Sequence, residues 1–425
     1  MTATFRLFLV CSFVLLARPQ DVLPFLQPFR PALVLTVLAT LALILGGQRQ
    51  ALSAALSTPE SKRYLLFFFI MILGIPFAYH RGLAFDGVLQ GYVVNVFFFV
   101  LLVSQATSLQ RLRSLVWVIC FSTLLYGVFG GLLQSGGFDG GRFQVLGDTH
   151  DPNDTAYVLL SLFPLCLYFV RFDAGLTKRL VAIAAIGGAI ATILLTGSRG
   201  GLLGLAAVLL ILLLTRTGGI GRGQKVIFLL VVASAGLLLQ DKINIERYLT
   251  LADISSDYNA SAEGGRIDLW TAAVELSLAN PITGVGVDCF SFAHWQSRAL
   301  AGELYLRYHA VHNSFLQIAA EVGLIGFVVY VLICLRSIVT FLRISRMPTH
   351  ARTPESRDMA ALGGLMLLGF VGLLVSGFFL SQGYSIFSTL YFALAAAMER
   401  LRAGFAAGDG AQSVKTLPGS SPRQA

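Results

Sequence analysis

The chain repeats one pattern along most of its length: an apolar run of about 16 to 22 residues, a short polar turn, then another apolar run. A helix of about 20 apolar residues is long enough to cross the hydrocarbon core of a bilayer. Only 12% of the 425 residues are charged, about half the proportion usual in soluble domains. Membrane β-barrels show alternating rather than continuous apolar residues. The pattern therefore predicts an all-α, polytopic membrane protein.

About twelve runs qualify as transmembrane helices, and one large loop separates the ninth from the tenth. The runs cover residues 5–17, 31–47, 64–79, 86–104, 114–134, 154–170, 180–196, 200–215, 226–240, 313–335, 360–379 and 384–400. This pattern predicts helices 1–9 in residues 1–240, a large periplasmic loop in residues 241–311, helices 10–12 in residues 312–402, and a disordered cytoplasmic tail in residues 403–425. No small-x-small cleavage site follows the first run, so we expect an uncleaved anchor.

The basic residues predict the orientation of these helices. With both termini in the cytoplasm, the cytoplasmic segments hold 21 of the 31 lysine and arginine residues, as the positive-inside rule requires. The formal charge of +9 is therefore a topology signal of a bacterial inner-membrane protein, not a sign of nucleic-acid binding. The five cysteines form no evident disulfide or metal-ligand pattern, and we predict neither a metal nor a cofactor.

The large loop contains a predicted amphipathic helix from Arg266 to Ala279. Its apolar residues recur at helical spacing on one face; they are Ile267, Trp270, Val274 and Leu278. A helix of this kind beside a bilayer often lies along the interface.

The first candidate site is the turn Gly197-Ser198-Arg199-Gly200-Gly201, between the seventh and eighth runs. Glycines permit close backbone approach, and the start of a helix attracts anions through its free N–H groups. Together with the Arg199 guanidinium they would form a phosphate site. The alternative is a plain tight turn with an arginine that reaches the membrane surface.

The second candidate is Arg266, which follows Gly264-Gly265 at the start of the loop helix. A guanidinium binds phosphate oxygens through two hydrogen bonds, which lysine cannot do. The alternative is a solvated loop charge that pairs with Asp268 or Glu263.

The third candidate is the pair His312-Asn313, where the large loop enters the tenth run. Histidine is suited to take a proton from a hydroxyl near neutral pH; the alternative is a helix-capping polar pair. Asn313 shares a helix face with Gln317 and Glu321, and we expect that face to line a cavity open to the outside.

The fourth candidate is the acidic stretch Gly147 to Asp154. Asp148, His150 and Asp151 could bind a divalent cation. The favoured interpretation is a helix start, with Asp151 as the cap and Pro152 at the first position. In that case Asp151 or Asn153 would still face the cavity.

These motifs, in this order, resemble those of the bacterial O-antigen ligase and polymerase superfamily. His312, Asn313, Gly323 and Gly326 fit its pattern of His, then Asn, Ser or Gln, nine residues, Gly, two residues, and Gly, Thr or Tyr. The turn at Ser198 resembles the family's SRGG element, and the stretch at Asp151 its DPN element. Arg266 and Trp270, with the following Gly284-Val285-Gly286, resemble its loop region.

The resemblance implies a glycosyltransferase that moves a glycan from undecaprenyl pyrophosphate to an acceptor hydroxyl in the periplasm, without a metal. Arg199 and Arg266 would hold the pyrophosphate, and His312 would orient or deprotonate the acceptor. Asn313, Asp151, Asn153, Ser198 and Trp270 would bind substrate or support these groups.

Several readings remain open within and beyond this family. The motifs do not separate a ligase onto lipid A–core from a polymerase that extends the growing glycan, and protein O-oligosaccharyltransferases share them. A polysaccharide or lipid transporter is the alternative from another class, although transporters tend to show repeated halves with a site near the membrane midplane. The sequence does not predict the oligomeric state.

Overall fold

The computed structural model describes residues 2–129, 138–139, 142–143, 151–172, 175–215, 221–249, 265–300, 302, 309–347 and 354–415. Two members of the possible cation site, Asp148 and His150, lie outside these residues.

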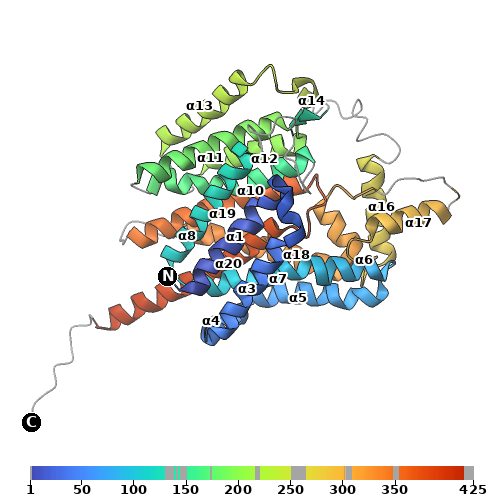
Figure 1. Cartoon of the computed structure of the whole chain (residues 1–425), viewed down its shortest axis with the longest axis horizontal. Coiled ribbons are helices and arrows are strands. Elements are labelled where there is room, and N and C mark those ends of the chain that lie inside the picture. Colours follow the sequence, from blue (N-terminus) through green and yellow to red (C-terminus); the bar gives the residue numbers. More distant parts are fainter. Residues whose placement is uncertain are drawn as a thin grey trace, which may run out of the picture.

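The described chain is almost entirely helical (Figure 1). Its first part comprises α1 (Ala3–Ala17), α2 (Pro19–Val22), η1 (Pro24–Phe29), α3 (Pro31–Leu45), α4 (Arg49–Ser57), α5 (Pro59–Gly74), η2 (Ile75–Phe77), α6 (Arg81–Phe85), η3 (Asp86–Tyr92), α7 (Val93–Gln105), α8 (Leu109–Leu124) and η4 (Leu125–Phe129). A two-stranded hairpin follows, β1 (Phe138–Asp139) and β2 (Arg142–Phe143). The remainder comprises α10 (Pro152–Phe172), α11 (Leu176–Leu195), α12 (Arg199–Leu214), α13 (Arg222–Leu238), α14 (Ile245–Leu249), α16 (Arg266–Ala279), α17 (Phe290–Leu300), α18 (Ser314–Ser345), α19 (Pro354–Gly377) and α20 (Ile386–Lys415).

The helices confirm the predicted class, an all-α multi-pass membrane protein. Among the described residues, seven helical stretches are long and apolar enough to cross a membrane: Phe25–Leu45, Arg81–Gln105, Leu109–Val128, Pro152–Phe172, Leu176–Leu195, Ser314–Ser345 and Pro354–Gly377. Shorter apolar helices occupy Ala3–Ala17, Arg199–Leu214 and Phe228–Leu238. Each predicted run lies mainly on a helix, but the number twelve stays a prediction.

The centre of the bundle is formed by α10 and α19, which pack closely together. Glycines of α19 make this approach possible, because a β-carbon on Gly369 would lie 3.0 Å from the Ser161 carbonyl oxygen and one on Gly372 would lie 3.2 Å from the Leu160 carbonyl oxygen. Small residues at helix contacts are the usual solution in membranes, where backbones must come close to gain packing energy. Figure 1 shows α6, α16 and α17 gathered at one end of the bundle, which we call the loop end.

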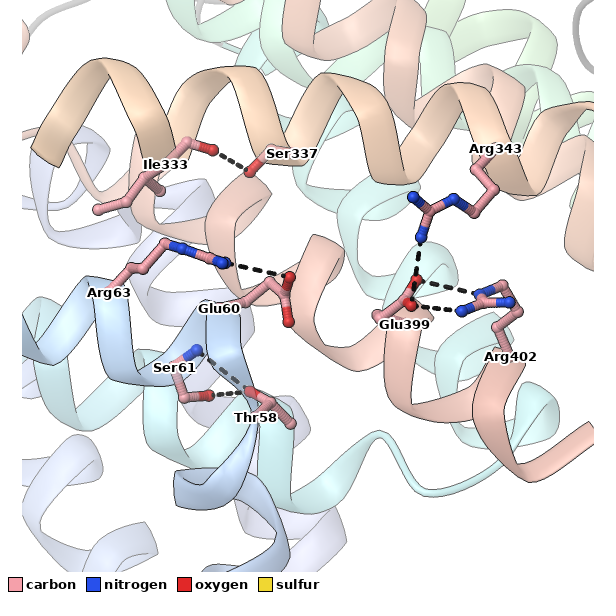
Figure 2. A network of polar contacts seen from close by, with 9 residues as sticks. All are labelled: Thr58, Glu60, Ser61, Arg63, Ile333, Ser337, Arg343, Glu399 and Arg402. Carbon is pink, nitrogen blue, oxygen red and sulfur yellow. Dashed lines mark hydrogen bonds and ion pairs between the residues drawn. The ribbon is translucent and has the colours of Figure 1, made fainter. Parts of the chain in front are cut away.

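At the opposite end, one ion pair joins α18 to α20 and others lie within α20 and α5 (Figure 2). Glu399 of α20 accepts a hydrogen bond from Arg402 at 2.5 Å and pairs with Arg343 of α18 at 3.6 Å. Glu60 pairs with Arg63 in the first turns of α5, where the Thr58 hydroxyl caps the helix by accepting from the Ser61 N–H at 3.1 Å. Charged residues thus concentrate where these helices leave the apolar bundle.

Helix α18 is broken at Gly323, whose backbone combines a positive φ of 79° with an extended ψ of 171°. The segment between α16 and α17 fills the break: the Val285 N–H donates to the Ala320 carbonyl at 2.9 Å and the Gly286 N–H to the Glu321 carbonyl at 3.0 Å. The Leu324 N–H donates to the Pro281 carbonyl at 2.8 Å. The two glycine motifs therefore meet, and together they anchor the large loop to the membrane helices.

Two expectations need adjustment. Helix α20 continues to Lys415, whereas we expected a tail without helical structure from Ala403; residues 416–425 lie outside the described part. Helix α16 has the predicted bounds. However, it packs on the protein through Leu269 and Ala273, which leaves the predicted apolar residues Ile267, Val274 and Leu278 exposed. An exposed apolar face suits the expected place along the membrane interface.

Candidate functional site

The turn before α12 is a tight turn that leads into a capped helix start. Gly197 adopts a left-handed conformation (φ 59°), and the Ser198 hydroxyl caps α12 by accepting from the Gly201 N–H at 3.1 Å. A β-carbon on Gly201 would lie 2.6 Å from the Ala156 side chain, so glycine is needed for contact with α10. Ser198 therefore acts as a helix cap, and Arg199 occupies the first, largely buried turn.

Two arginines that the sequence did not single out flank this turn. Arg142 of β2 donates through Nε to the Thr196 carbonyl at 2.9 Å, and Arg247 of α14 donates through Nε to the Gly197 carbonyl at 3.0 Å. Beside them, the Tyr248 hydroxyl donates to the Leu194 carbonyl at 3.0 Å. Three guanidinium groups thus surround the end of α11 and the start of α12.

The positive charges of this cluster act on one another. Burial lowers the pKa of the Arg142 guanidinium to about 10, and the charge of Arg247 acts in the same direction. Arg199 has a smaller effect of the same sign, which Asp151 opposes. Because repulsion among like charges is relieved by a bound anion, the cluster is suited to a phosphate or pyrophosphate group.

Asp151 and Asn153 connect the arginine cluster to the start of α10. The Asp151 Oδ1 atom accepts from the Asn153 backbone N–H and from its Nδ2, both at 2.7 Å, so Asp151 caps the helix as expected. The Asn153 Oδ1 atom in turn accepts from Arg142 Nη2 at 3.1 Å. Asn153 therefore positions Arg142, and Asp151 positions Asn153.

Asp151 also lies within electrostatic reach of His312. It adopts a left-handed backbone conformation (φ 54°) that turns the chain into α18, and its N–H donates to the Ser381 hydroxyl at 2.8 Å. Burial lowers the pKa of the imidazole, and the charge of Arg266 lowers it further, whereas Asp151 raises it. The shift favours a neutral imidazole, which is the form that can accept a proton.

Arg266 begins α16 after Gly265, and no side chain caps this helix. Asp268, a suggested partner for Arg266, accepts hydrogen bonds from Arg298 at 2.7 and 2.8 Å. Trp270, one turn further, packs edge-to-face on Phe378 with ring centroids 5.5 Å apart. The loop arginine is thus held near His312 by a helix that is anchored through aromatic packing.

Four helices begin at this site: α10, α12, α16 and α18. Asp151 lies within electrostatic reach of both Arg142 and His312. The charge of Arg199 acts on the pKa of Arg142, and the charge of Arg266 acts on the pKa of His312. The partial positive charge of each helix N-terminus adds to that of the arginines. The structure thus brings together Arg199, Arg266, His312, Asp151 and Asn153, which the sequence had distributed over more than 100 positions.

The polar face of α18 makes hydrogen bonds within the protein. Asn313 caps the helix, since its Oδ1 accepts from the Phe315 N–H at 3.0 Å and the Leu316 N–H at 3.1 Å. Gln317 accepts from the Gly383 N–H at 3.1 Å, and Glu321 from the Phe290 N–H at 3.2 Å. All three side chains are buried. Asn313 thus caps its own helix, and Gln317 and Glu321 hold neighbouring loops in place; that this face lines an open cavity stays a prediction.

A cavity of about 470 Å³ does lie at this end of the bundle, between the end of α1 and the starts of α10 and α20. Its polar lining comprises Arg18, Gln20, Asn95, Asp154, Asp288, Gln382 and Ser385, with the rings of Tyr92, Tyr157 and Tyr384. The Gln382 amide donates to Asp154 at 2.9 Å, and the preceding Ser381 accepts from His312. One short loop therefore separates His312 from a cavity rich in amide, carboxylate and aromatic groups.

Sequence reasoning missed Arg142 and Arg247. Both lie in polar segments without periodicity, and only the fold brings them to Gly197. An available signal was that Arg142, Arg199, Arg247 and Arg266 are four of the few basic residues on the side opposite the predicted cytoplasmic segments. An arginine that departs from the positive-inside bias points to a local function.

Part of the chain is similar to known proteins. Residues 180–331, which include Arg199, Arg266 and His312, match the model of the O-antigen ligase family. An uncharacterized protein of Haemophilus influenzae is 30% identical over 215 residues, 48% of this chain and 52% of that protein. The exopolysaccharide production protein ExoQ of Rhizobium meliloti is 28% identical over 112 residues, 24% of each chain. The chain thus spans about half the length of the first relative and about a quarter of the second. This match and the relation to ExoQ confirm the predicted resemblance to the O-antigen ligase and polymerase superfamily.

Proposed function

We propose that this protein is a bacterial inner-membrane glycosyltransferase that transfers a glycan from undecaprenyl pyrophosphate to an acceptor hydroxyl on the periplasmic face. The observation that carries the proposal is that Asp151 lies within electrostatic reach both of Arg142, in the arginine cluster, and of His312, whose pKa is lowered. A cationic site suits the pyrophosphate of the donor, and a neutral imidazole suits the acceptor hydroxyl. The relation to ExoQ, named for exopolysaccharide production, supports a glycan as the substrate.

The proposed reaction is a single displacement. His312 takes the proton of the acceptor hydroxyl, the acceptor oxygen forms a bond to the anomeric carbon, and the bond from that carbon to the pyrophosphate oxygen breaks. The lipid pyrophosphate leaves with the electron pair, and Arg142, Arg199, Arg247 and Arg266 stabilise its charge. Attack from the face opposite the leaving group predicts inversion at the anomeric carbon.

The cavity next to the Ser381–Gln382 loop is the proposed place of the acceptor. Amide and carboxylate groups hydrogen-bond to sugar hydroxyls, and tyrosine rings offer flat apolar faces. Its charges are mixed, with Arg18 against Asp154 and Asp288, which suits a hydroxyl-rich group better than a pyrophosphate. Both lipid A–core and a growing glycan fit this description.

Reconstitution tests the proposal. The purified full chain is mixed with undecaprenyl-pyrophosphate glycan and lipid A–core, and the products are analysed by mass spectrometry. Glycan on lipid A–core indicates a ligase, and a longer glycan on undecaprenyl indicates a polymerase; an added protein acceptor tests for an oligosaccharyltransferase. Absence of any new glycosidic bond, together with movement of the lipid-linked glycan across the vesicle, would favour the transporter alternative.

A further inference from the structure

A second cavity, of about 540 Å³, lies at the other end of α10, away from the candidate site. On α10 the first cavity is lined by residues 154–158 and the second by residues 168–172, so their lining residues lie about 15 to 27 Å apart along the helix. The lining comes from α1, α8, the end of α10 and the start of α11. This cavity has no role in the proposed transfer reaction.

The lining is divided between basic and apolar groups. Arg113 and Lys178 provide the positive charge, and Gln110 and Ser114 add polar groups. The remaining lining residues are largely apolar or aromatic; they are Leu9, Trp117, Val118, Tyr168, Phe169 and Phe172. Such a division matches a molecule with an anionic head and a hydrocarbon part.

The basic groups sit at helix ends, where a bilayer has its headgroups. Arg113 lies in the second turn of α8 and Lys178 in the first turn of α11. The Lys178 ammonium lies 6.0 Å from the Trp117 ring and 5.9 Å from the Phe169 ring, and this aromatic contact keeps it beside the cavity. Arg171 and Arg179 follow on the same helix ends, so the surroundings are positive.

Asp358 is an acidic group beside this cluster. Asp358 of α19 pairs with Arg113 and accepts from the Tyr168 hydroxyl at 3.1 Å. The Arg113 side chain still keeps 38% of its surface exposed. Asp358 thus fixes the guanidinium in place but leaves part of it accessible, and Lys178 contributes a second basic group to the lining.

We infer that this cavity binds the phosphate headgroup of an anionic phospholipid in the leaflet opposite the candidate site. Basic pockets between membrane helices are a known mode of headgroup recognition, and tryptophan favours the membrane interface. Arg113 and Lys178 would bind the phosphate oxygens, and Trp117, Phe169 and Phe172 would pack on the glycerol and the first acyl carbons. The inference is independent of the glycan-transfer proposal.

Native mass spectrometry of the purified full chain, titrated with cardiolipin, tests the inference. The double variant Arg113→Gln/Lys178→Gln should weaken binding by about 30-fold, because each basic residue near a headgroup contributes about a factor of five. The matched control is the double variant Arg111→Gln/Arg179→Gln. It removes the same charge from the same two helices, α8 and α11, at positions outside the cavity lining. This control should bind cardiolipin as the native chain does.

A second variant covers the case in which the double variant does not fold. Asp358→Asn keeps an acceptor for Tyr168 but removes the negative charge, and it should strengthen cardiolipin binding by about fivefold. Equal losses in the two double variants, or no gain in Asp358→Asn, would overturn the inference. Binding of inorganic phosphate as strong as that of cardiolipin would also overturn it, since the apolar lining would then contribute nothing.

Discussion

Gly323 and Gly284 lie so close that a β-carbon on Gly323 would be 2.8 Å from the amide nitrogen of Gly284. Gly323 breaks a membrane helix, and Gly284 belongs to the large loop. At the break, the backbone of the loop forms hydrogen bonds with the backbone of the helix. This contact determines where α16, and with it Arg266, stands relative to His312.

Gly323→Ala should therefore destabilise the protein by about 2 to 4 kcal/mol, because it combines backbone strain at positive φ with a close contact. Thermal unfolding in detergent measures the effect. The control is Gly187→Ala in α11, where a β-carbon would meet nothing within 4 Å. An equal Tm for both variants would show that the glycine contact does not hold the loop.

His312→Ala should reduce the transfer rate by about 100- to 10,000-fold, the usual contribution of a general base. Circular dichroism and thermal unfolding should be unchanged for a valid comparison. The control is His80→Ala, a histidine that caps α6 at the loop end. If His312→Ala kept the native rate, another group would have to take the proton.

The pH dependence of kcat/KM should follow the protonation of His312. Since burial and Arg266 lower its pKa, activity should rise through a midpoint below the ordinary value of about 6.5 and stay level above it. Arg266→Gln removes a positive charge, so the midpoint of the remaining activity should move to higher pH. An unchanged midpoint would show that the charge of Arg266 does not act on the pKa of His312.

Arg142→Gln should raise the KM for the lipid-linked donor by about 10- to 100-fold, since hydrogen bonds to charged groups contribute about 1.5 to 3 kcal/mol. Asn153→Ala should act in the same direction but less strongly, because Asn153 only positions Arg142. Arg298→Gln, which lies on α17 and pairs with Asp268, is the control. A donor KM that responds equally to all three substitutions would contradict a specific arginine cluster.

Gln382→Ala should raise the KM for the acceptor several-fold and leave the donor KM unchanged, because Gln382 lines the cavity and not the arginine cluster. The control is Gln90→Ala, in the same end of the bundle but bonded to Asp86. An effect on the donor alone would place the lipid-linked glycan in the cavity instead.

The sequence predicts those features that arise from residues close to one another along the chain. Hydrophobic runs predict the helices, and Asp151 is identified as a cap from the neighbouring residues. The cap at Asn313 is only the alternative interpretation of its motif, and the cap made by Ser198 is not predicted. Contacts between distant segments could not be predicted in this way. Arg142 reaches Gly197 only because the hairpin folds over the end of α11, and Glu321 receives a loop N–H that no spacing indicates.

The shared position of Asp151 gives donor binding a further consequence. Among the described residues, the charges of Arg266 and His309 lower the pKa of His312, and the carboxylate of Asp151 raises it. A pyrophosphate on the arginines would bring additional negative charge to the same place and raise the proton affinity of the imidazole. The bound donor would therefore make His312 a stronger base toward the acceptor hydroxyl. An acceptor or a water molecule that arrived before the donor would meet a weaker proton acceptor.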